Sequence, residues 1–272
     1  GKVTRTTTVW QNKSYDAGQY GTSVLGEIIG SGKFTFPKSV YAVMDTLKYF
    51  IANKKNALVI DFFAGSGTTM HAVNLLNSID NGHRRCIMVT NNEVSADEAK
   101  ALDEKGYRPG DKEWDRLGIA RYVTWPRTVC SIKGCNIDGK PLDGNYGCNV
   151  EQYTEIEGEI VNPETGKKIR GKVYKKEKEP AYPELADLKM SDGFKTNAVF
   201  FKLSFLDKTS VALGRQFKEL LPVLWMKGGA IGKCPALESD ELPSMLILPQ
   251  NKMAVLIDEI YYSEFDAELS QH

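Results

Sequence analysis

The residues with the clearest chemical potential surround the glycine-rich turn Ala64-Gly65-Ser66-Gly67. An apolar run that ends near Asp61 precedes this turn, and Glu93 follows a second apolar run. If both runs are parallel strands, the two acids lie at the carboxyl edge of one sheet, where ligands bind in open α/β folds. Glycines let a ligand approach the backbone closely, and a carboxylate accepts hydrogen bonds from ribose hydroxyls. The pattern therefore predicts a site for a nucleoside-containing ligand.

Two better-known phosphate-binding turns do not fit this stretch. A P-loop requires G-x-x-x-x-G-K-[ST], and Gly65-Ser66-Gly67-Thr68-Thr69 contains no lysine. The dinucleotide fingerprint G-x-G-x-x-G needs a third glycine where this chain has Met70. The remaining interpretation is a turn that holds an adenosyl compound without a diphosphate.

The elements that would position these residues form a strand–helix–strand unit. Residues 57–63 are a short continuous apolar run, which is typical of a buried parallel strand. Residues 68–76 have helical spacing, and residues 86–90 are a second apolar strand. Together they predict a right-handed βαβ unit of a doubly wound fold.

Upstream of this unit, residues 7–32 are polar and rich in glycine, and we expect irregular chain there. Phe36-Pro37-Lys38-Ser39 then precedes a run with helical periodicity from Val40 to Phe50, for which Ser39 is a plausible N-cap.

Downstream, polar residues alternate with apolar ones on both sides of the turn 162–166. Glutamates alternate with isoleucine before the turn, and lysine and arginine alternate with apolar residues after it. This period of two predicts an inserted β-hairpin whose acidic and basic arms pair across the strands. The hairpin's basic arm, residues 167–178, either contacts the phosphates of an anionic partner or is balanced by its acidic partner strand.

The C-terminal part has mixed elements. We expect strands at 197–206 and 253–257 and helices at 211–226 and 262–269. The predicted division is a ligand-binding part at 1–134, the hairpin insertion at 135–183 and a smaller α+β region at 184–272.

Composition restricts the function classes. The chain has 272 residues, 42% of them hydrophobic and 26% charged, with a net charge of zero, as in a soluble globular protein. No apolar run approaches the ~20 residues that a membrane span needs. Five cysteines without C-x-x-C spacing suit a reducing cytoplasm, and three histidines make a zinc site a poor expectation. The chain begins with Gly1 rather than Met, as expected of a fragment.

The run Asp61-Phe62-Phe63-Ala64-Gly65-Ser66-Gly67-Thr68-Thr69 closely resembles motif I of the beta-class amino-methyltransferases of DNA. The stretch from His71 to Glu93 is similar to the modification subunits of type III restriction–modification systems. Thr8-Val9-Trp10, Gly21-Thr22 and residues 34–39 look like motif X of that family. The resemblance covers residues 1–130.

This resemblance implies a Rossmann-like methyltransferase fold, present in part, and S-adenosylmethionine as the cofactor. The residues that it places at the cofactor are Phe36, Lys38, Ser39, Asp61, Phe63, Ala64, Gly65, Gly67, Thr68 and Glu93. Phe63 to Gly67 would surround the methionine part, and Glu93 would accept the ribose hydroxyls. Asp61 would orient the loop or reach the cofactor amine, and Phe36, Lys38 and Ser39 would close the pocket. No metal is implied.

In this family a D-P-P-Y-type catalytic motif precedes motifs X and I, and this chain has no Pro-Pro dipeptide. The resemblance thus implies the C-terminal portion of a larger adenine-N6 DNA methyltransferase, with no catalytic residue of its own and inactive alone. Its expected partners are DNA, a missing N-terminal catalytic half, and a second copy or a restriction subunit.

Other interpretations stay open at this stage. The chain could be a non-catalytic dimerisation or DNA-docking module with a methyltransferase-like fold, or its parent could methylate RNA or another amine. Asp61 could be a loop brace, Glu93 and Lys38 could be solvated charges, and His71 is more plausibly a packed histidine than a base.

Overall fold

The computed structural model describes residues 8–161, 165–203, 205–212, 216–237, 239 and 241–272. Packing divides the chain into two units, one up to Phe200 and one from Phe201 to His272. Residues 184–200 pack with the first unit.

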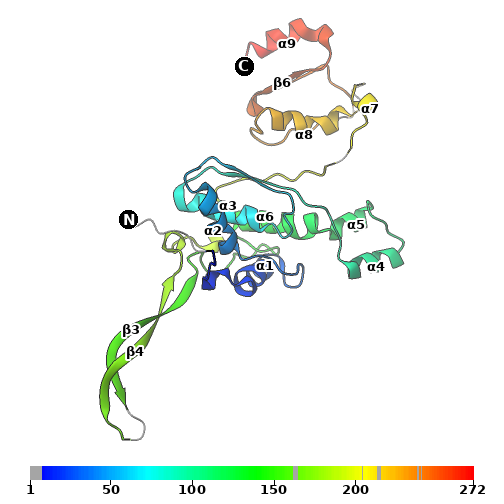
Figure 1. Ribbon diagram of the computed structural model, residues 1–272. Coiled ribbons are helices and arrows are strands. Elements are labelled where there is room, and N and C mark those ends of the chain that lie inside the picture. Colours follow the sequence, from blue (N-terminus) through cyan, green and yellow to red (C-terminus); the bar gives the residue numbers. More distant parts are fainter. Residues whose placement is uncertain (1–7, 162–164, 204, 213–215, 238, 240) are drawn as a thin grey trace. The chain divides into compact units, whose positions relative to one another are not determined.

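The first unit combines a helical core with two small sheets (Figure 1). Its α-helices are α1 (Val24–Ile29), α2 (Val40–Ile51), α3 (Thr68–Asp80), α4 (Ala96–Glu104), α5 (Lys112–Leu117) and α6 (Trp125–Lys133). Its strands are β1 (Leu58–Asp61), β2 (Arg85–Met88), β3 (Asn149–Val161) and β4 (Lys168–Pro180). Single 3-10 turns lie at Lys13–Tyr15, Pro183–Leu185 and Met190–Asp192, and π-helical segments at Gly18–Ser23 and Ala120–Thr124.

The strand–helix–strand unit is present as predicted. Strand β1 pairs in parallel with β2, with Leu58 opposite Arg85 and Asp61 opposite Met88, and α3 connects the two strands. Helix α2 begins after Ser39, whose hydroxyl accepts a hydrogen bond from the amide of Ala42. The N-cap interpretation of Ser39 is therefore confirmed.

Helix α3 lies at the centre of the core. Most of its residues from Thr68 to Leu76 are buried, and its apolar side chains Ala72, Leu75 and Leu76 join a cluster with residues of α1, α2 and α6. The same cluster includes buried residues on either side of the β3–β4 hairpin, among them Tyr146 and Tyr182. Because α3 is packed on several sides, it holds the segments that precede and follow it in fixed positions.

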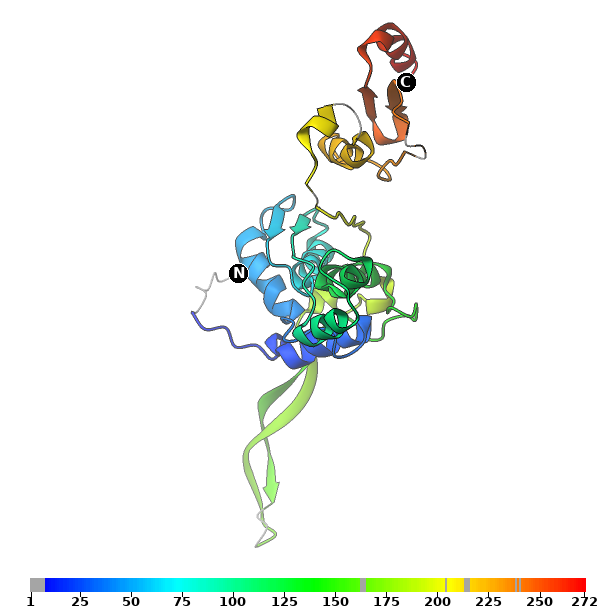
Figure 2. The same ribbon diagram turned by 90° about the vertical axis from the view of Figure 1, so that its right-hand side faces the viewer.

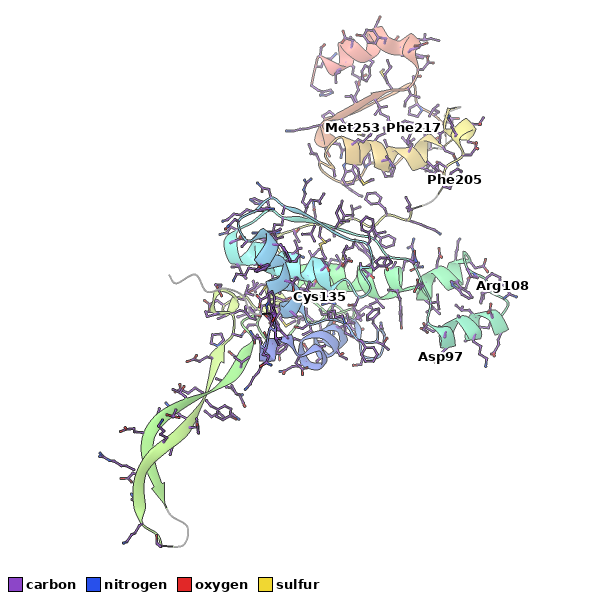
Figure 3. All side chains as sticks on the ribbon, in the orientation of Figure 1. Asp97, Arg108, Cys135, Phe205, Phe217 and Met253 are labelled. Carbon is purple, nitrogen blue, oxygen red and sulfur yellow. The ribbon has the colours of Figure 1, made fainter. Side chains whose placement is uncertain are left out.

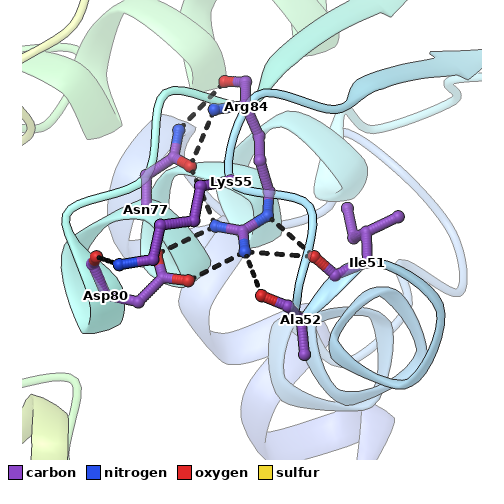
Figure 4. A network of polar contacts seen from close by, with 6 residues as sticks. All are labelled: Ile51, Ala52, Lys55, Asn77, Asp80 and Arg84. Atoms are coloured by element: carbon purple, nitrogen blue, oxygen red, sulfur yellow. Dashed lines mark hydrogen bonds and ion pairs between the residues drawn. The ribbon is translucent and has the colours of Figure 1, made fainter.

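Arg84 ties the far end of α3 to α2 (Figure 4). Its side chain is fully buried and pairs with the carboxylate of Asp80 at 2.8 Å. The same guanidinium donates to the carbonyl oxygens of Ile51 and Ala52 at the end of α2. Asn77 closes the network because its amide group both donates to the backbone carbonyl of Arg84 and accepts from its backbone amide. Arg84 thereby sets where β2 begins.

The prediction that residues 57–63 form a buried strand is wrong in one respect. One face of the β1–β2 sheet is open, since Leu58 and Ile60 are 47% and 50% exposed and Ile87, opposite Ile60, is 48% exposed. The reason is that this two-stranded sheet contacts α3 on one side only. A parallel sheet ordinarily has both faces covered.

The expectation of irregular chain at 7–32 is also wrong for the described residues. They contain the turn Lys13–Tyr15, the π-helical segment Gly18–Ser23 and α1. Leu25, Ile28 and Ile29 have the i, i+3, i+4 spacing of a helix and are buried in the core. The many glycines masked this short apolar pattern.

Strands β3 and β4 form a long twisted ribbon, as predicted (Figure 2). The cross-strand charge pairs are present, with Lys172 on Glu155 at 2.6 Å and Lys168 on Glu159 at 2.8 Å. The predicted turn at 162–166 lies largely outside the described residues. Because these pairs are exposed, they contribute little to stability.

The second unit contains α7 (Lys208–Ala212), α8 (Phe217–Lys227) and α9 (Tyr262–Leu269), with antiparallel strands β5 (Met245–Leu248) and β6 (Met253–Leu256). The predictions for α9 and β6 are confirmed, and the described part of the helix predicted at 211–226 falls into α7 and α8. No described helix of the chain is long and apolar enough to cross a membrane.

The strand predicted at 197–206 is wrong for the residues described there, which have no strand partner. Alternating apolar residues make a strand only where another strand offers its backbone. Instead the side chains of Leu203 and Phe205 are 95% and 93% exposed (Figure 3).

We expect Arg84→Met to lower the free energy of unfolding of the first unit by about 3 kcal/mol, because it removes the buried guanidinium that pairs with Asp80 and donates to two helix-terminal carbonyl groups. Urea denaturation followed by circular dichroism measures this. Arg108→Met is the matched control, since Arg108 makes a 2.6 Å pair with Asp103 at the surface. It should cost less than about 1 kcal/mol. Equal losses would contradict the role given to Arg84.

Candidate functional site

The carboxylate of Asp61 braces the turn between β1 and α3. One oxygen accepts from the amide of Phe63 at 3.0 Å, and the other accepts from the hydroxyl of Thr69 at 2.6 Å. Asp61 thus joins the end of the strand to the first turn of the helix. These contacts give Asp61 the role of a loop brace.

The turn itself depends on two glycines in left-handed conformations. Gly65 has φ +48° and Gly67 has φ +78°, a region that residues with a Cβ rarely adopt. Gly67 is the N-cap of α3 and offers no side chain to its first amides. Helix amides without a side-chain cap, at the positive end of the helix dipole, form a site for an anionic group.

Side chains from distant segments close the turn from both sides. The ring of Phe34 lies 3.2 Å from where a Cβ on Gly65 would stand, and the methyl group of Thr124 lies 3.2 Å from that position on Gly67. The hydroxyl of Thr124 donates to the carbonyl of Gly65. Any larger residue at these glycines would push against a neighbour. The region resembling motif X therefore meets the glycine turn in space.

Beneath the turn lies Arg127, which the sequence analysis missed. Its side chain is fully buried, and Nη1 donates to the hydroxyls of Ser66 at 3.0 Å and Thr68 at 2.8 Å. Burial lowers the pKa of Arg127 to about 10. The signal in the sequence was weak, because one arginine in a helix usually lies at the surface.

The other predicted cofactor residues take different positions. Ala64 and Thr68 are buried within the turn. The backbone amide of Ala64 donates a hydrogen bond to the carbonyl of Val89 at 3.2 Å. Phe63 is 91% exposed, and Phe36 is 87% exposed with φ +56°, an unusual conformation for a residue with a side chain. Phe63 directly precedes the turn, so its exposed ring leaves aromatic surface available there.

Lys38 and Ser39 have different environments in the structure. The side chain of Lys38 is exposed, whereas Ser39 is buried and its hydroxyl donates to the backbone carbonyl of Ser14 at 2.6 Å. Since that hydroxyl also caps α2, it is already engaged. The structure therefore uses Ser39 to fix the start of the helix.

Glu93 follows β2 at the same edge as Asp61. Its exposed carboxylate accepts from the side-chain amide of Asn91 at 3.3 Å, and its backbone carbonyl accepts from the amide of Ile119 at 2.7 Å. Asn92 is held more firmly, because it donates to the carbonyl of Asp115. The loop after β2 is thus anchored, while the Glu93 carboxylate faces outward.

His71 lies on the buried face of α3. Its Nε2 is 2.9 Å from the Tyr146 hydroxyl, and its ring packs edge-on against Tyr146 and Phe194. Burial, and after it the charge of Arg127, hold the pKa of His71 well below its usual value. These contacts are those of a packed, neutral histidine.

Each of the five cysteines is a free thiol. Within the described residues, no group of three histidine, cysteine or acidic side chains is arranged to hold a metal ion.

Comparison with known proteins finds similarity in the part of the chain that contains the glycine turn. Residues 2–100 match the family model described as DNA methylase. The type II methyltransferase M.KpnI of Klebsiella pneumoniae is 39% identical over 85 residues, 31% of this chain and 20% of that protein. The type III restriction-modification enzyme EcoPI Mod subunit of Escherichia phage P1 is 39% identical over 100 residues, 37% of this chain and 15% of that protein.

The StyLTI Mod subunit of Salmonella typhimurium is 38% identical over 85 residues, 31% of this chain and 12% of that protein. The N-terminal part of this chain is therefore related to the DNA methylases. The relatives named here are a type II methyltransferase and two Mod subunits of type III restriction-modification enzymes. The matched stretch spans a fifth or less of each of these relatives.

The buried His71 predicts a pH effect on stability. Below its usual pKa of 6.5 the unfolded chain takes up a proton at this residue and the folded chain does not. The free energy of unfolding therefore decreases as the pH is lowered. The loss is at most about 1.4 kcal/mol for each pH unit below that value. We expect His71→Gln to weaken this dependence in urea denaturation between about pH 7.5 and about pH 5.5. The exposed His83, changed to Gln, serves as the control and should leave the dependence intact.

Proposed function

We propose that this chain is the S-adenosylmethionine-binding portion of a site-specific adenine-N6 DNA methyltransferase of a restriction–modification system. One observation carries the proposal. The glycine turn at the carboxyl edge of the β1–β2 sheet has a helix start without a side-chain cap, Asp61 at the end of β1 and Glu93 in the loop after β2, and it lies within the stretch that matches DNA methylases.

The residues of the turn suit this cofactor. Gly65 and Gly67 adopt left-handed conformations that residues with a Cβ rarely take, so they shape the backbone of the turn on which the ligand would lie. The first amides of α3 suit the methionine carboxylate, and Glu93, which is exposed in the loop that follows β2, suits the ribose hydroxyls. Such a pocket needs no diphosphate-binding glycine at Met70.

Aromatic residues would complete the pocket. The rings of Phe36 and Phe63 are exposed, and the sulfonium of the cofactor is a cation that aromatic faces attract. Lys38 would lie on the same side. Ser39 would act through the start of α2, because its hydroxyl is engaged with Ser14.

A missing N-terminal half is consistent with the open face of the sheet. Leu58, Ile60 and Ile87 form exposed apolar surface on a sheet of two parallel strands, which is too small to be stable as an uncovered element. In the complete enzyme, further strands and helices would continue and cover this sheet into a Rossmann-like fold. That half would carry the catalytic D-P-P-Y-type motif and hold the flipped adenine.

When bound, the cofactor supplies an activated methyl group. The residues of this chain would position it, through the glycine turn and Glu93, and exclude water through the aromatic side of the pocket. The proposed partners of the complete protein are DNA and a restriction subunit, and a second copy is a further candidate. The alternative, a non-catalytic docking module, differs in predicting that the chain does not bind the cofactor.

Isothermal titration with S-adenosylmethionine tests the cofactor site. We expect saturable binding by the chain, weakened roughly tenfold by Glu93→Ala, because the ribose hydroxyls lose a charged acceptor. Glu104→Ala is the control, since Glu104 is an exposed acid on α4. Absence of binding by the folded chain, or an equal loss in both variants, would count against the proposed site.

A transfer assay tests the division of labour between the halves. With labelled cofactor and duplex DNA, we expect no methyl transfer by this chain alone, because it contains no Pro-Pro dipeptide and hence no D-P-P-Y motif. Cofactor binding in the same preparation is the positive control. Measurable transfer to DNA would mean that the catalytic residues lie in this chain after all.

A further inference from the structure

Arg127 has a partly unsatisfied guanidinium beneath the glycine turn. Its Nη1 bonds the hydroxyls of Ser66 and Thr68 and approaches the carbonyl of Ser66 at 3.3 Å. Its Nε and Nη2 are buried without a hydrogen-bond partner. Buried N–H groups nearly always have a hydrogen-bond partner, so the two unpartnered nitrogen atoms of Arg127 require an explanation.

The charge of Arg127 is also uncompensated. All of its hydrogen-bond partners are neutral, and it makes no ion pair with a described residue. The other fully buried arginine, Arg84, pairs with the carboxylate of Asp80 at 2.8 Å. A buried cation without a counter-ion is costly, which makes an anionic group nearby favourable.

The position of Arg127 connects this charge to the turn. Thr124 and Arg127 are three residues apart in the helical stretch formed by the π-helical segment Ala120–Thr124 and α6, so they face the same way. Thr124 bonds the carbonyl of Gly65, and Arg127 bonds the two residues that flank Gly67. π-Helical segments often occur at functional sites because they shift the facing of side chains. The pair holds the turn from below.

We propose that Arg127 is a positioning residue for the carboxylate of the cofactor. It orients the uncapped start of α3 through Ser66 and Thr68, and its uncompensated charge favours an anionic group at the helix start. The side chain acts from behind the turn and does not contact the ligand. This inference rests on the proposed cofactor-binding function and adds that the site selects ligands bearing a carboxylate.

The test compares two ligands that differ in one group. Isothermal titration is carried out with S-adenosylmethionine and with its decarboxylated analogue, which lacks only the methionine carboxylate. The chain is tested unchanged and as Arg127→Met, Arg127→Gln and Arg127→Lys. Arg84→Lys is the matched control, a change in the other buried arginine, which lies at the opposite end of α3. Circular dichroism establishes the folded fraction of each variant.

We expect the unchanged chain to prefer the carboxylated ligand. Arg127→Met should weaken binding of S-adenosylmethionine about tenfold, equivalent to about 1.4 kcal/mol, and leave the analogue nearly unaffected. Arg127→Gln keeps a hydrogen-bond donor and should lose the preference too, so the result does not depend on whether the methionine variant folds. Arg127→Lys should retain part of the preference, and Arg84→Lys all of it.

Other outcomes separate this inference from the function on which it rests. If the Arg127 variants weaken both ligands equally, or the unchanged chain does not distinguish them, Arg127 has no role toward the carboxylate and the cofactor site itself stands. If the unchanged chain binds neither ligand, the proposed cofactor-binding function fails, and the inference fails with it.

Discussion

The burial of α3 is the constraint on which the rest of the first unit depends. Its start carries the glycine turn, its middle carries His71, and its end carries Asn77 and Asp80, which bind Arg84. A helix packed on several sides cannot slide or rotate without opening the core. The turn is therefore held in place by packing as well as by its own hydrogen bonds.

The two buried arginines serve the two ends of this helix in different ways. Arg84 satisfies Asp80 and the carbonyl groups at the end of α2, so its charge and its N–H groups are used within the chain. Arg127 meets only neutral partners and keeps two buried nitrogen atoms without acceptors. Structural networks tend towards complete satisfaction, and departures from it concentrate at functional sites. The difference between them marks the glycine-turn end of α3 as the end at which a ligand is expected.

The open face of the β1–β2 sheet leaves apolar surface of the first unit uncovered. Ile60 and Ile87, paired across the strands, are about as exposed as they are buried. In the relatives the matched stretch is a fifth or less of the protein, so a partner segment that covers this face is consistent with their size. Under this proposal the cofactor residues and the catalytic residues come from different parts of one sheet.

The sequence alone determined the local elements and the position of the turn. The glycines at 65 and 67, the acid at 61 and the helical spacing after Ser39 act over a few residues, and each led to a correct strand, turn or helix. Tertiary structure decided what depends on distant neighbours. It brought Phe34, Thr124 and Arg127 to the turn, left one face of the sheet open, and gave residues 197–203 no strand to pair with. Periodicity specifies which side of an element is apolar, but only packing decides what covers that side.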